Sequence, residues 1–298
     1  MIALTGGSGF IGSHLVAEIR KRGMSFLCLY RESRRGNALA AGGSPSRQVD
    51  FASQESLNHA LKGCRVLVHV LGVINAESAD LLRINVDYTR RLVEAAKANG
   101  VQKIVLMSSV AAIRRHGAYG ESKFQAEEIV RGSGIAFHII RPAFVYGTGD
   151  QNTMDMMIRT IKHWPVIPLL GGGNFKLQPV YVKDIVGVLM KMIDLPGMNE
   201  AYSVAGPEQV SLKEILVALA QHLKCKRWFI PIPLKPVQCL MRGYIRIFPN
   251  TRLPAKQILE LDKHEAFDIG ATRKAFGFDP VPFSKGIAMT FQELPCAA

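Results

Sequence analysis

Hydrophobic residues in the first half of the chain alternate between short continuous runs and helically spaced positions. Continuous apolar runs at 2–4, 26–30, 65–70, 103–107 and 136–140 predict buried strands. Amphipathic spacing at 10–22, 79–99 and 119–131 predicts helices between them. Such alternation is typical of right-handed βαβ crossovers, so the sequence predicts an α/β fold with a doubly wound parallel sheet, a Rossmann domain.

This rhythm loosens after Arg141-Pro142, where a smaller C-terminal substrate lobe is expected to begin. A helix is predicted at 154–162, followed by a glycine triplet at 171–173. A strand–helix unit at 179–192 and a strand at 202–204 are expected to return to the large sheet. The predicted organisation is a dinucleotide-binding domain over 1–150, rejoined by 176–206, with most of 151–298 forming the substrate lobe.

The turn between the first strand and the first helix reads Thr5-Gly6-Gly7-Ser8-Gly9-Phe10-Ile11-Gly12. A pyrophosphate can approach a helix N-terminus only where the turn residues lack Cβ atoms, and Gly6, Gly9 and Gly12 meet that need. The strand–turn–helix context makes this spacing specific for a dinucleotide. Ser8, Phe10 and Ile11 are therefore predicted to bind the cofactor along with the three glycines.

The end of the second strand bears on the choice of nucleotide. NAD-selective sites usually carry a carboxylate there for the adenosine ribose 2′-hydroxyl, whereas this strand ends in Tyr30-Arg31. Arg31, supported by Arg34 or Arg35, could bind a 2′-phosphate through charge-assisted hydrogen bonds. NADP(H) is favoured, and NAD(H) with Glu32 turned inward is the alternative.

Tyr119 and Lys123 lie four residues apart at the beginning of a predicted helix and share one face. A phenol there can exchange a proton with an alcohol or carbonyl, while the lysine ammonium favours the phenolate and can hold ribose hydroxyls. Ser108 and Ser109 end the preceding strand, and either hydroxyl could bind the reacting oxygen. These four residues form the predicted catalytic set, and Tyr119 and Lys123 are also predicted to contact the cofactor.

Charge and cysteine content narrow the classes of partner and compartment. A formal net charge of +13 favours an anionic partner, such as a phosphorylated cofactor, an anionic substrate or acidic lipid. No basic arm or nucleic-acid motif is present, so no nucleic acid is expected. Five scattered cysteines without a CxxC pair indicate reduced thiols, and the absence of a secretory signal or of a roughly 20-residue apolar run favours the cytoplasm.

Two further patterns have structural interpretations. None of the eight histidines has metal-binding spacing, so no metal is expected; His69 and His138, in apolar strands, are interpreted as satisfied core residues. Apolar residues at helical spacing over 237–248 could rest on anionic lipid at the inner face of a membrane or receive an apolar tail. Packing against the substrate lobe explains that stripe equally well and is favoured.

Together these residues resemble the extended and atypical short-chain dehydrogenase/reductase family. The motifs are Gly6-x-x-Gly9-x-x-Gly12, Ser108-Ser109, Tyr119-x-x-x-Lys123, Arg141-Pro142-x-x-x-Tyr146-Gly147 and Pro179-Val180-Tyr181-Val182-x-Asp184. Leu71-Gly72-Val73-Ile74 and the 175–182 segment look most like the group containing the NADPH-binding accessory subunit of respiratory complex I.

The resemblance implies further roles. Asp50 and Phe51 would border the adenine, Leu71, Gly72 and Val73 would pass the phosphates and ribose, and Asn85 would brace the sheet edge. Asp184 would be structural. The residues implied to line the nicotinamide are Pro142, Ala143, Phe144 and Val145. Lys176 and Gln178-Pro179 replace an Arg-Asp pair usual in members acting on nucleotide sugars, which weakens that assignment.

The function expected is that of an NADP(H)-dependent oxidoreductase, or an epimerase or dehydratase, acting on a carbonyl or alcohol of a small-molecule substrate. The alternative is a non-catalytic NADP(H)-binding accessory subunit or assembly factor of a redox complex. Peripheral membrane association and a homodimer are left open.

Overall fold

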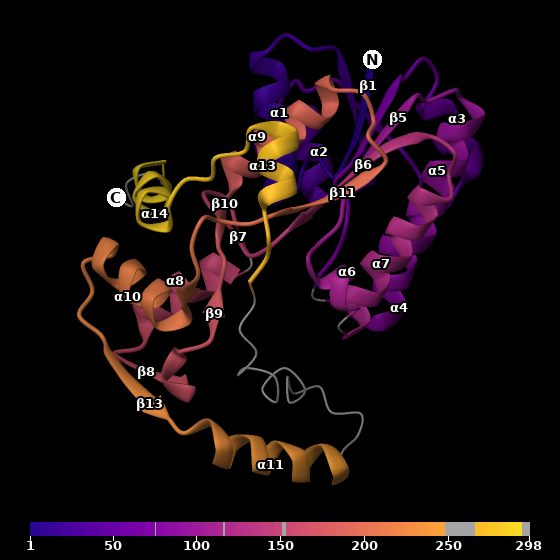
Figure 1. The fold of residues 1–298 in the computed structure, drawn as a ribbon. Helices are drawn as coiled ribbons and strands as arrows, with labels where there is room; N and C mark the ends of the chain where they lie inside the picture. The colour runs from indigo at the N-terminus through magenta and orange to yellow at the C-terminus, as the bar shows by residue number, and fades with distance from the viewer. Residues whose placement is uncertain (75, 116, 151–152, 248–265, 294–298) are drawn as a thin grey trace. The chain divides into compact units, whose positions relative to one another are not determined.

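The structure is a computed structural model that describes residues 1–74, 76–115, 117–150, 153–247 and 266–293 (Figure 1). The chain divides into two compact units. The first comprises Met1–Ala143, Val182–Val204 and Asp268–Asp279, and the second comprises Phe144–Tyr181, Ala205–Phe267 and Pro280–Ala298.

A seven-stranded sheet forms the centre of the first unit, in the order β11-β6-β5-β4-β1-β2-β3. Every strand pair is parallel, which confirms the predicted doubly wound Rossmann fold. The strands are β1 (Ile2–Thr5), β2 (Phe26–Tyr30), β3 (Ser46–Gln48), β4 (Val66–His69), β5 (Lys103–Met107), β6 (Ala136–Pro142) and β11 (Glu200–Val204).

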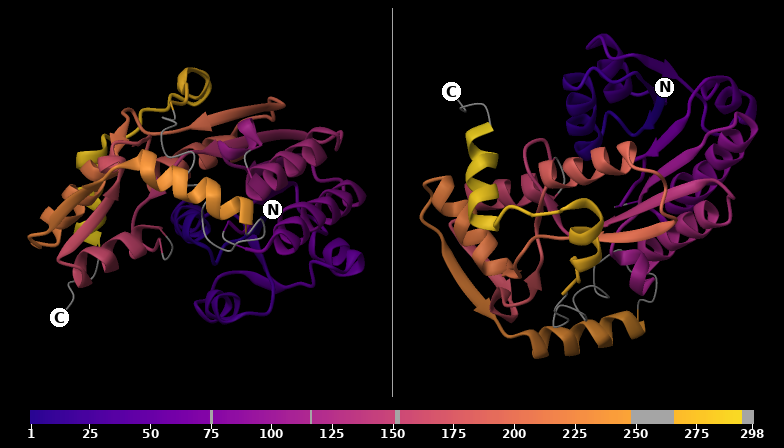
Figure 2. Two further views of the ribbon diagram at one scale, coloured as in Figure 1. Left: turned by 90° about the horizontal axis from the view of Figure 1, so that it is seen from below. Right: turned by 45° about the horizontal axis from the view of Figure 1, so that its top comes forward.

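Helices cover both faces of this sheet, as Figures 1 and 2 show. One face carries α1 (Phe10–Lys21) and α9 (Val182–Asp194), and the other carries α3 (Gln54–Ala60), α5 (Tyr88–Ala98) and α7 (Gly117–Arg131). Shorter helices are α2 (Arg34–Ala41), α4 (Ser78–Leu81), α6 (Ala111–Arg114) and α13 (Gly270–Phe276). The core between the sheet and α3, α5 and α7 is built from side chains such as Leu57, Leu92 and Ile104, all fully buried.

The single helix predicted over 79–99 is in fact three pieces. A π-helical turn, η1 (Leu82–Asp87), separates α4 from α5. The hydrophobic pattern continues through such a turn and cannot reveal it. A π-helical turn differs from an α-helix in its backbone hydrogen bonds, which join residues five apart instead of four.

The second unit consists of three strand pairs and five helices among its described residues. β7 (Val145–Tyr146) pairs with β10 (Val180–Tyr181), β9 (Lys176–Leu177) with β12 (Val210–Ser211), and β8 (Val166–Leu170) with β13 (Trp228–Ile232). The helices are α8 (Thr153–His163), the 3-10 turn η2 (Gly171–Gly173), α10 (Leu212–His222), α11 (Leu234–Ile247) and α14 (Phe283–Glu293).

Two expectations need correction here. In the strand–helix unit predicted at 179–192, the helix belongs to the first unit, but its strand, β10, pairs with β7 instead of joining the large sheet. The amphipathic stripe predicted over 237–248 lies on α11, with Phe248 outside the described residues; packing of the stripe against the substrate lobe was favoured, but none of the described residues of α11 is fully buried. No helix in the described part of the chain has the length and apolar character needed to span a membrane.

Candidate functional site

The glycine turn after β1 is so tight that neither Gly6 nor Gly12 has room for a side chain. Gly6 has a φ of +79°, and a Cβ there would lie 2.5 Å from the Leu71 backbone nitrogen. A Cβ on Gly12 would lie 2.0 Å from the Gly6 carbonyl oxygen. The turn therefore packs directly against the segment that follows β4, and both positions require glycine.

This turn leads into the N-terminus of α1. Gly9 occupies the N-cap without a side-chain cap, and the Ser13 N–H donates to the Gly9 carbonyl over 2.9 Å. The N–H groups of Phe10, Ile11 and Gly12 precede that bond and have no acceptor within the helix. Because the first turn carries no acidic residue, it favours a bound anion such as a pyrophosphate.

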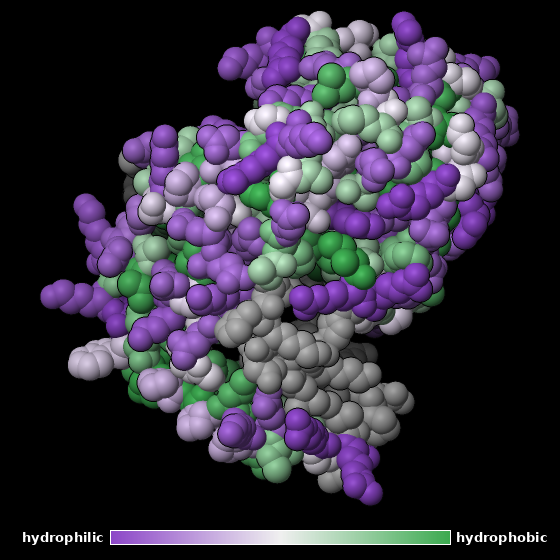
Figure 3. Space-filling view, in the orientation of Figure 1, coloured by the Kyte–Doolittle hydropathy of each residue, from purple (hydrophilic) through white to green (hydrophobic). Residues whose placement is uncertain are grey.

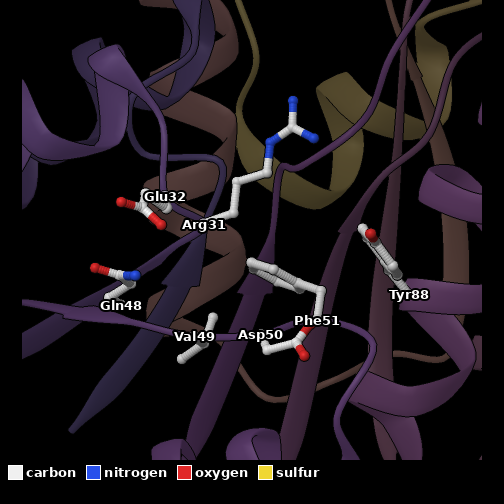
Figure 4. A pocket seen from close by; sticks show the side chains of 7 residues that line it. All are labelled: Arg31, Glu32, Gln48, Val49, Asp50, Phe51 and Tyr88. Carbon is white, nitrogen blue, oxygen red and sulfur yellow. The ribbon is translucent and has the colours of Figure 1, made fainter.

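A cavity of about 410 Å³ lies beyond the ends of β2 and β3. Figure 4 shows its lining residues, which are Arg31, Glu32, Gln48, Val49, Asp50, Phe51 and Tyr88. The ring of Phe51 stacks on Tyr88 with centroids 5.5 Å apart, and Asp50 accepts the Ala52 N–H over 2.8 Å. The cavity thus brings together Arg31, Asp50 and Phe51, three of the residues predicted for the adenosine end.

Tyr88 is a lining residue that the sequence analysis missed. It lies on α5, 37 positions after Phe51, and no local signal links the two.

Arg31 and Glu32 are neighbours at the mouth of this cavity, and their side chains diverge in Figure 4. Helix α2 starts close by, with Ser33 accepting the Gly36 N–H over 3.1 Å. A Cβ on Gly36 would lie 2.5 Å from the Tyr30 ring, so glycine lets the first turn of α2 approach the end of β2. That turn carries Arg34 and Arg35; the side chain of Arg34 lies outside what is described.

Tyr119 and Ser109 form the hydroxyl pair at the carboxyl end of β5. Their side chains are hydrogen-bonded, which lowers the pKa of Tyr119, but burial raises it by more. The net pKa of Tyr119 therefore lies above its usual value, and the expected effect of the Lys123 ammonium on this phenol stays a prediction.

Lys123 is 5% exposed and its ammonium donates to the Met107 carbonyl over 2.8 Å. Burial lowers the pKa of Lys123 to about 8, opposed by the negative charge of Glu127. A Cβ on Gly72 would lie only 2.9 Å from the ammonium nitrogen. The ammonium therefore lies against the segment after β4, where Leu71, Gly72 and Val73 were predicted to meet the cofactor.

The two adjacent serines, either of which was expected to hold the reacting oxygen, face different partners. Ser108 is 3% exposed and donates to the Glu127 carboxylate over 2.5 Å, so it is engaged in the core. Ser109, partly buried, is the serine that meets Tyr119. Consecutive residues at a strand end point in opposite directions, and the motif alone could not say which one faces the tyrosine.

Glu127 is a site residue that the sequence analysis missed. Its carboxylate is fully buried and receives two hydrogen bonds from Arg141, Nε–Oε1 at 2.8 Å and Nη2–Oε2 at 2.5 Å. Arg131 approaches to 3.8 Å. The signal was its position four residues after Lys123, which continues the Tyr119–Lys123 face by one more turn.

Asn85, which the resemblance implied would brace the sheet edge, holds the segment that leaves the carboxyl end of β4. It lies in the π-helical turn, where its amide exchanges two hydrogen bonds of 3.0 Å with the Val73 backbone. Its Nδ2 also donates to Ser122 over 3.0 Å. Asn85 therefore fastens the segment after β4 to α7, the helix that carries Tyr119 and Lys123.

The two strand histidines differ from each other. His69 is held between Thr5 and Thr89, at 2.6 and 2.9 Å, and burial lowers its pKa to about 3, so it is the satisfied core residue expected. His138 bonds to the Pro196 carbonyl through Nε2, but its buried Nδ1 has no hydrogen-bond partner among the described residues. The expectation of a fully satisfied core histidine is therefore wrong for His138. In the described part of the chain, no three metal-ligating side chains come together.

The residues predicted to line the nicotinamide fall on a unit boundary. Pro142 and Ala143 end the first unit, where the Ala143 N–H donates to the Val204 carbonyl over 2.9 Å. Phe144 and Val145 open the second unit, where the Phe144 carbonyl accepts from Val180 over 2.8 Å.

The sequence of the chain is similar to a family model and to several characterised proteins. Residues 2–205 match the model of the NAD dependent epimerase/dehydratase family. A ceramide reductase of Caulobacter vibrioides is 29% identical over 236 residues, covering 78% of this chain and 74% of that protein. Subunit 9 of the NADH dehydrogenase [ubiquinone] 1 alpha subcomplex, a mitochondrial protein of Arabidopsis thaliana, is 25% identical over 277 residues, covering 88% and 68%.

Among solved structures, the UDP-glucose 4-epimerase of Thermus thermophilus in complex with NAD has a similar fold. Its TM-score is 0.78 at 21% identity, covering 100% of this chain and 99% of that one. The segment matched by the family model includes the glycine turn, Ser109, Tyr119 and Lys123.

Proposed function

Since this chain belongs to the NAD-dependent epimerase/dehydratase family, as its sequence motifs predicted, we propose that it is an NADP(H)-dependent oxidoreductase acting on a carbonyl or alcohol of a small molecule. The observation that carries the proposal is the Tyr119–Ser109 hydroxyl pair at the end of β5, with the Lys123 ammonium one helical turn away. Burying the ammonium of Lys123 costs stability, and a purely structural position on α7 would not require it.

The residues divide the proton chemistry among them. A bound nicotinamide supplies or accepts the hydride. Tyr119 donates its phenolic proton to the carbonyl oxygen in the reductive direction and takes it back in oxidation. Ser109 orients that oxygen through a hydrogen bond, and Lys123, whose pKa of about 8 lies near neutrality, stabilises the phenolate that forms when the proton leaves.

For the cofactor, the glycine turn and the α1 N-terminus support a dinucleotide, and Arg31 supports NADP(H). Arg31 lines the adenosine-side cavity, and its guanidinium diverges from Glu32 (Figure 4). A guanidinium can bind a 2′-phosphate bidentately, whereas a carboxylate would repel it.

Calorimetric titration with NADP⁺ and NAD⁺ tests the cofactor proposal. Arg31→Ala should weaken NADP⁺ binding by about 10- to 100-fold, the worth of a charge-assisted hydrogen bond, and leave NAD⁺ nearly unchanged. Glu32→Gln is the matched control: if it weakens NAD⁺ binding more than Arg31→Ala weakens NADP⁺ binding, the preference is reversed.

Oxidation of NADPH in the presence of a panel of ketones and aldehydes tests the catalytic proposal. Tyr119→Phe should lower turnover by about 10²- to 10⁴-fold without loss of NADPH binding, because only the proton donor is removed. Tyr202→Phe, a change of the same kind on β11, should leave turnover unchanged. Equal turnover in Tyr119→Phe and the unaltered protein would contradict the assigned role.

The similarity to a respiratory-complex subunit keeps a second function in view, a subunit that binds NADP(H) without turning it over. Tight binding of the nucleotide with no hydride exchange across the panel, together with a stoichiometric protein partner on purification, would favour that function. Self-association as a homodimer stays a prediction, for which sedimentation velocity is the measurement.

A further inference from the structure

The β8/β13 pair in the second unit exposes apolar side chains to solvent on one face. Along β8, Ile167 and Leu169 are buried while Val166 and Pro168 are exposed. The parallel register places Trp228 beside Val166 and Ile230 beside Pro168, so these four side chains share the outer face. Together with Trp164, just before β8, we call them the tryptophan face.

Exposure on this face is high for such large residues. Trp228 is 76% exposed, Trp164 64%, Ile230 49% and Val166 41%. The two tryptophans are the only ones in the chain. A cluster of exposed apolar groups of this size on a folded protein marks an interaction surface, because removing apolar side chains from water lowers the free energy.

The chain segments that carry the tryptophan face are cationic. Residues 156–183, which include β8, contain no Asp or Glu, and neither do residues 215–247, which include β13 and α11. The latter segment carries Lys224, Lys226, Arg227, Lys235, Arg242 and Arg246. Figure 3 shows hydrophobic residues at the surface over β8 and β13 with hydrophilic side chains at their margin.

The cations at this margin have different roles. Arg227 donates to the carbonyls of Ile161 and Lys162 at the end of α8, so it fixes β13 in place. Lys224 and Lys226 are exposed and line a cavity of about 360 Å³ whose apolar wall includes Val217 and Phe229. Because Phe229 alternates with Trp228 and Ile230 along β13, this cavity lies on the other side of the strand pair, and Lys224 and Lys226 carry positive charge at its edge.

Helix α11 continues directly from β13 and has the same character. None of its described residues is buried, and Leu240 is 69% exposed. Val237, Leu240, Met241 and Tyr244 share one side of the helix, and Lys235, Arg242 and Arg246 lie on the opposite side. A helix of this composition is typical of those that lie in a membrane interface.

From these observations we infer that the tryptophan face and α11 dock the protein onto an anionic phospholipid surface. Tryptophan is favoured at headgroup depth because its ring is apolar while its N–H is polar. The absence of acidic residues from segments 156–183 and 215–247 suits anionic headgroups better than a protein partner, whose surface would carry both signs. This inference goes beyond the proposed function and does not depend on it.

Co-sedimentation of the full chain with vesicles is the first test. The protein should sediment with equal-part phosphatidylserine and phosphatidylcholine vesicles, much less with phosphatidylcholine alone, and less as salt is added. Because both tryptophans lie in the docking surface, their fluorescence should shift to the blue on binding and be quenched by brominated lipid. No binding to the anionic vesicles at low salt would overturn the inference.

Variants separate this surface from general basicity. Lys224→Glu with Lys226→Glu should weaken vesicle binding by about tenfold or more, since each cation near an anionic surface contributes about fivefold. Lys62→Glu with Lys97→Glu makes the same charge change on exposed positions of the first unit and should have a much smaller effect. Circular dichroism verifies that each variant is folded.

Two further outcomes would also overturn the inference. One is an equal loss of binding in both double variants, which would assign binding to net charge. The other is a blue shift that depends on protein concentration without lipid, with dimers in sedimentation velocity, which would assign the tryptophan face to a second copy of the chain.

Discussion

Replacing Lys123 by methionine tests how strongly burial acts on this site. The Lys123 side chain is 5% exposed, and its pKa falls from an ordinary 10.5 to about 8. Between these two values the unfolded chain keeps a proton that the folded chain has released, so stability rises with pH across that window. At about 1.4 kcal/mol per pH unit, the rise amounts to about 3 kcal/mol.

The Lys123→Met variant should lack that rise. Urea denaturation of the nucleotide-stripped protein at several pH values gives the free energy of unfolding of each form. The wild-type value minus the variant value should increase by about 3 kcal/mol from pH 8 to pH 10.5, with other titrating groups cancelling in the difference. Lys97→Met, at an exposed position of α5, is the control for loss of a lysine. A difference that stays flat within about 0.5 kcal/mol would refute the argument that burial depresses this pKa.

Three other predictions concern neighbouring residues. Ser109→Ala should lower turnover by about tenfold or more, because the Ser109 hydroxyl bonds to Tyr119. Ser108→Ala should mainly lower the free energy of unfolding, by about 1–3 kcal/mol, because the Glu127 carboxylate loses a buried hydrogen bond. Steady-state rates and urea denaturation of both variants test this difference. Glu127→Gln should lower the free energy of unfolding by about 3–5 kcal/mol because Arg141 keeps a charge without its partner, and a loss below about 1 kcal/mol in urea would contradict the buried pair. Gly12→Ala should abolish NADP⁺ binding in calorimetry, because the new Cβ would lie 2.0 Å from the Gly6 carbonyl oxygen. Gly187→Ala on α9 is the control and should bind NADP⁺ normally, because its Cβ would have no atom within 4 Å. Normal binding by Gly12→Ala would refute the steric argument for the turn.

Hydrophobic periodicity was enough to predict six of the seven strands of the large sheet, because buried parallel strands are apolar on both faces, and the four longest helices of the first unit, α1, α5, α7 and α9. The short strand β3 and the short helices α2, α3, α6 and α13 were not predicted. The glycine turn could also be predicted from the sequence, because the close backbone contacts at Gly6 and Gly12 leave no room for a Cβ atom. Periodicity could not reveal the π-helical turn that aims Asn85 at the Val73 backbone.

Contacts between distant segments were not predictable in the same way. Ser108 and Ser109 are chemically identical, and only the position of Glu127 and Tyr119 in space separates their roles. Tyr88 contacts the Phe51 ring although α3, β4, α4 and η1 separate the two residues along the chain, and the pairing of Glu127 with Arg141 joins α7 to β6. Each depends on how elements pack, which a single sequence does not record.

The division of the chain into two units has a consequence for its synthesis. The first unit is assembled from three separate stretches, the last ending at Asp279. Until Glu200–Val204 has left the ribosome, the outer edge of β6, a largely apolar strand that also carries His138 and Arg141, is unpaired and open to pairing with another nascent chain. The first unit is therefore complete only once residues up to Asp279 have been synthesised, and until Val204 has emerged the open edge of β6 is exposed to mispairing.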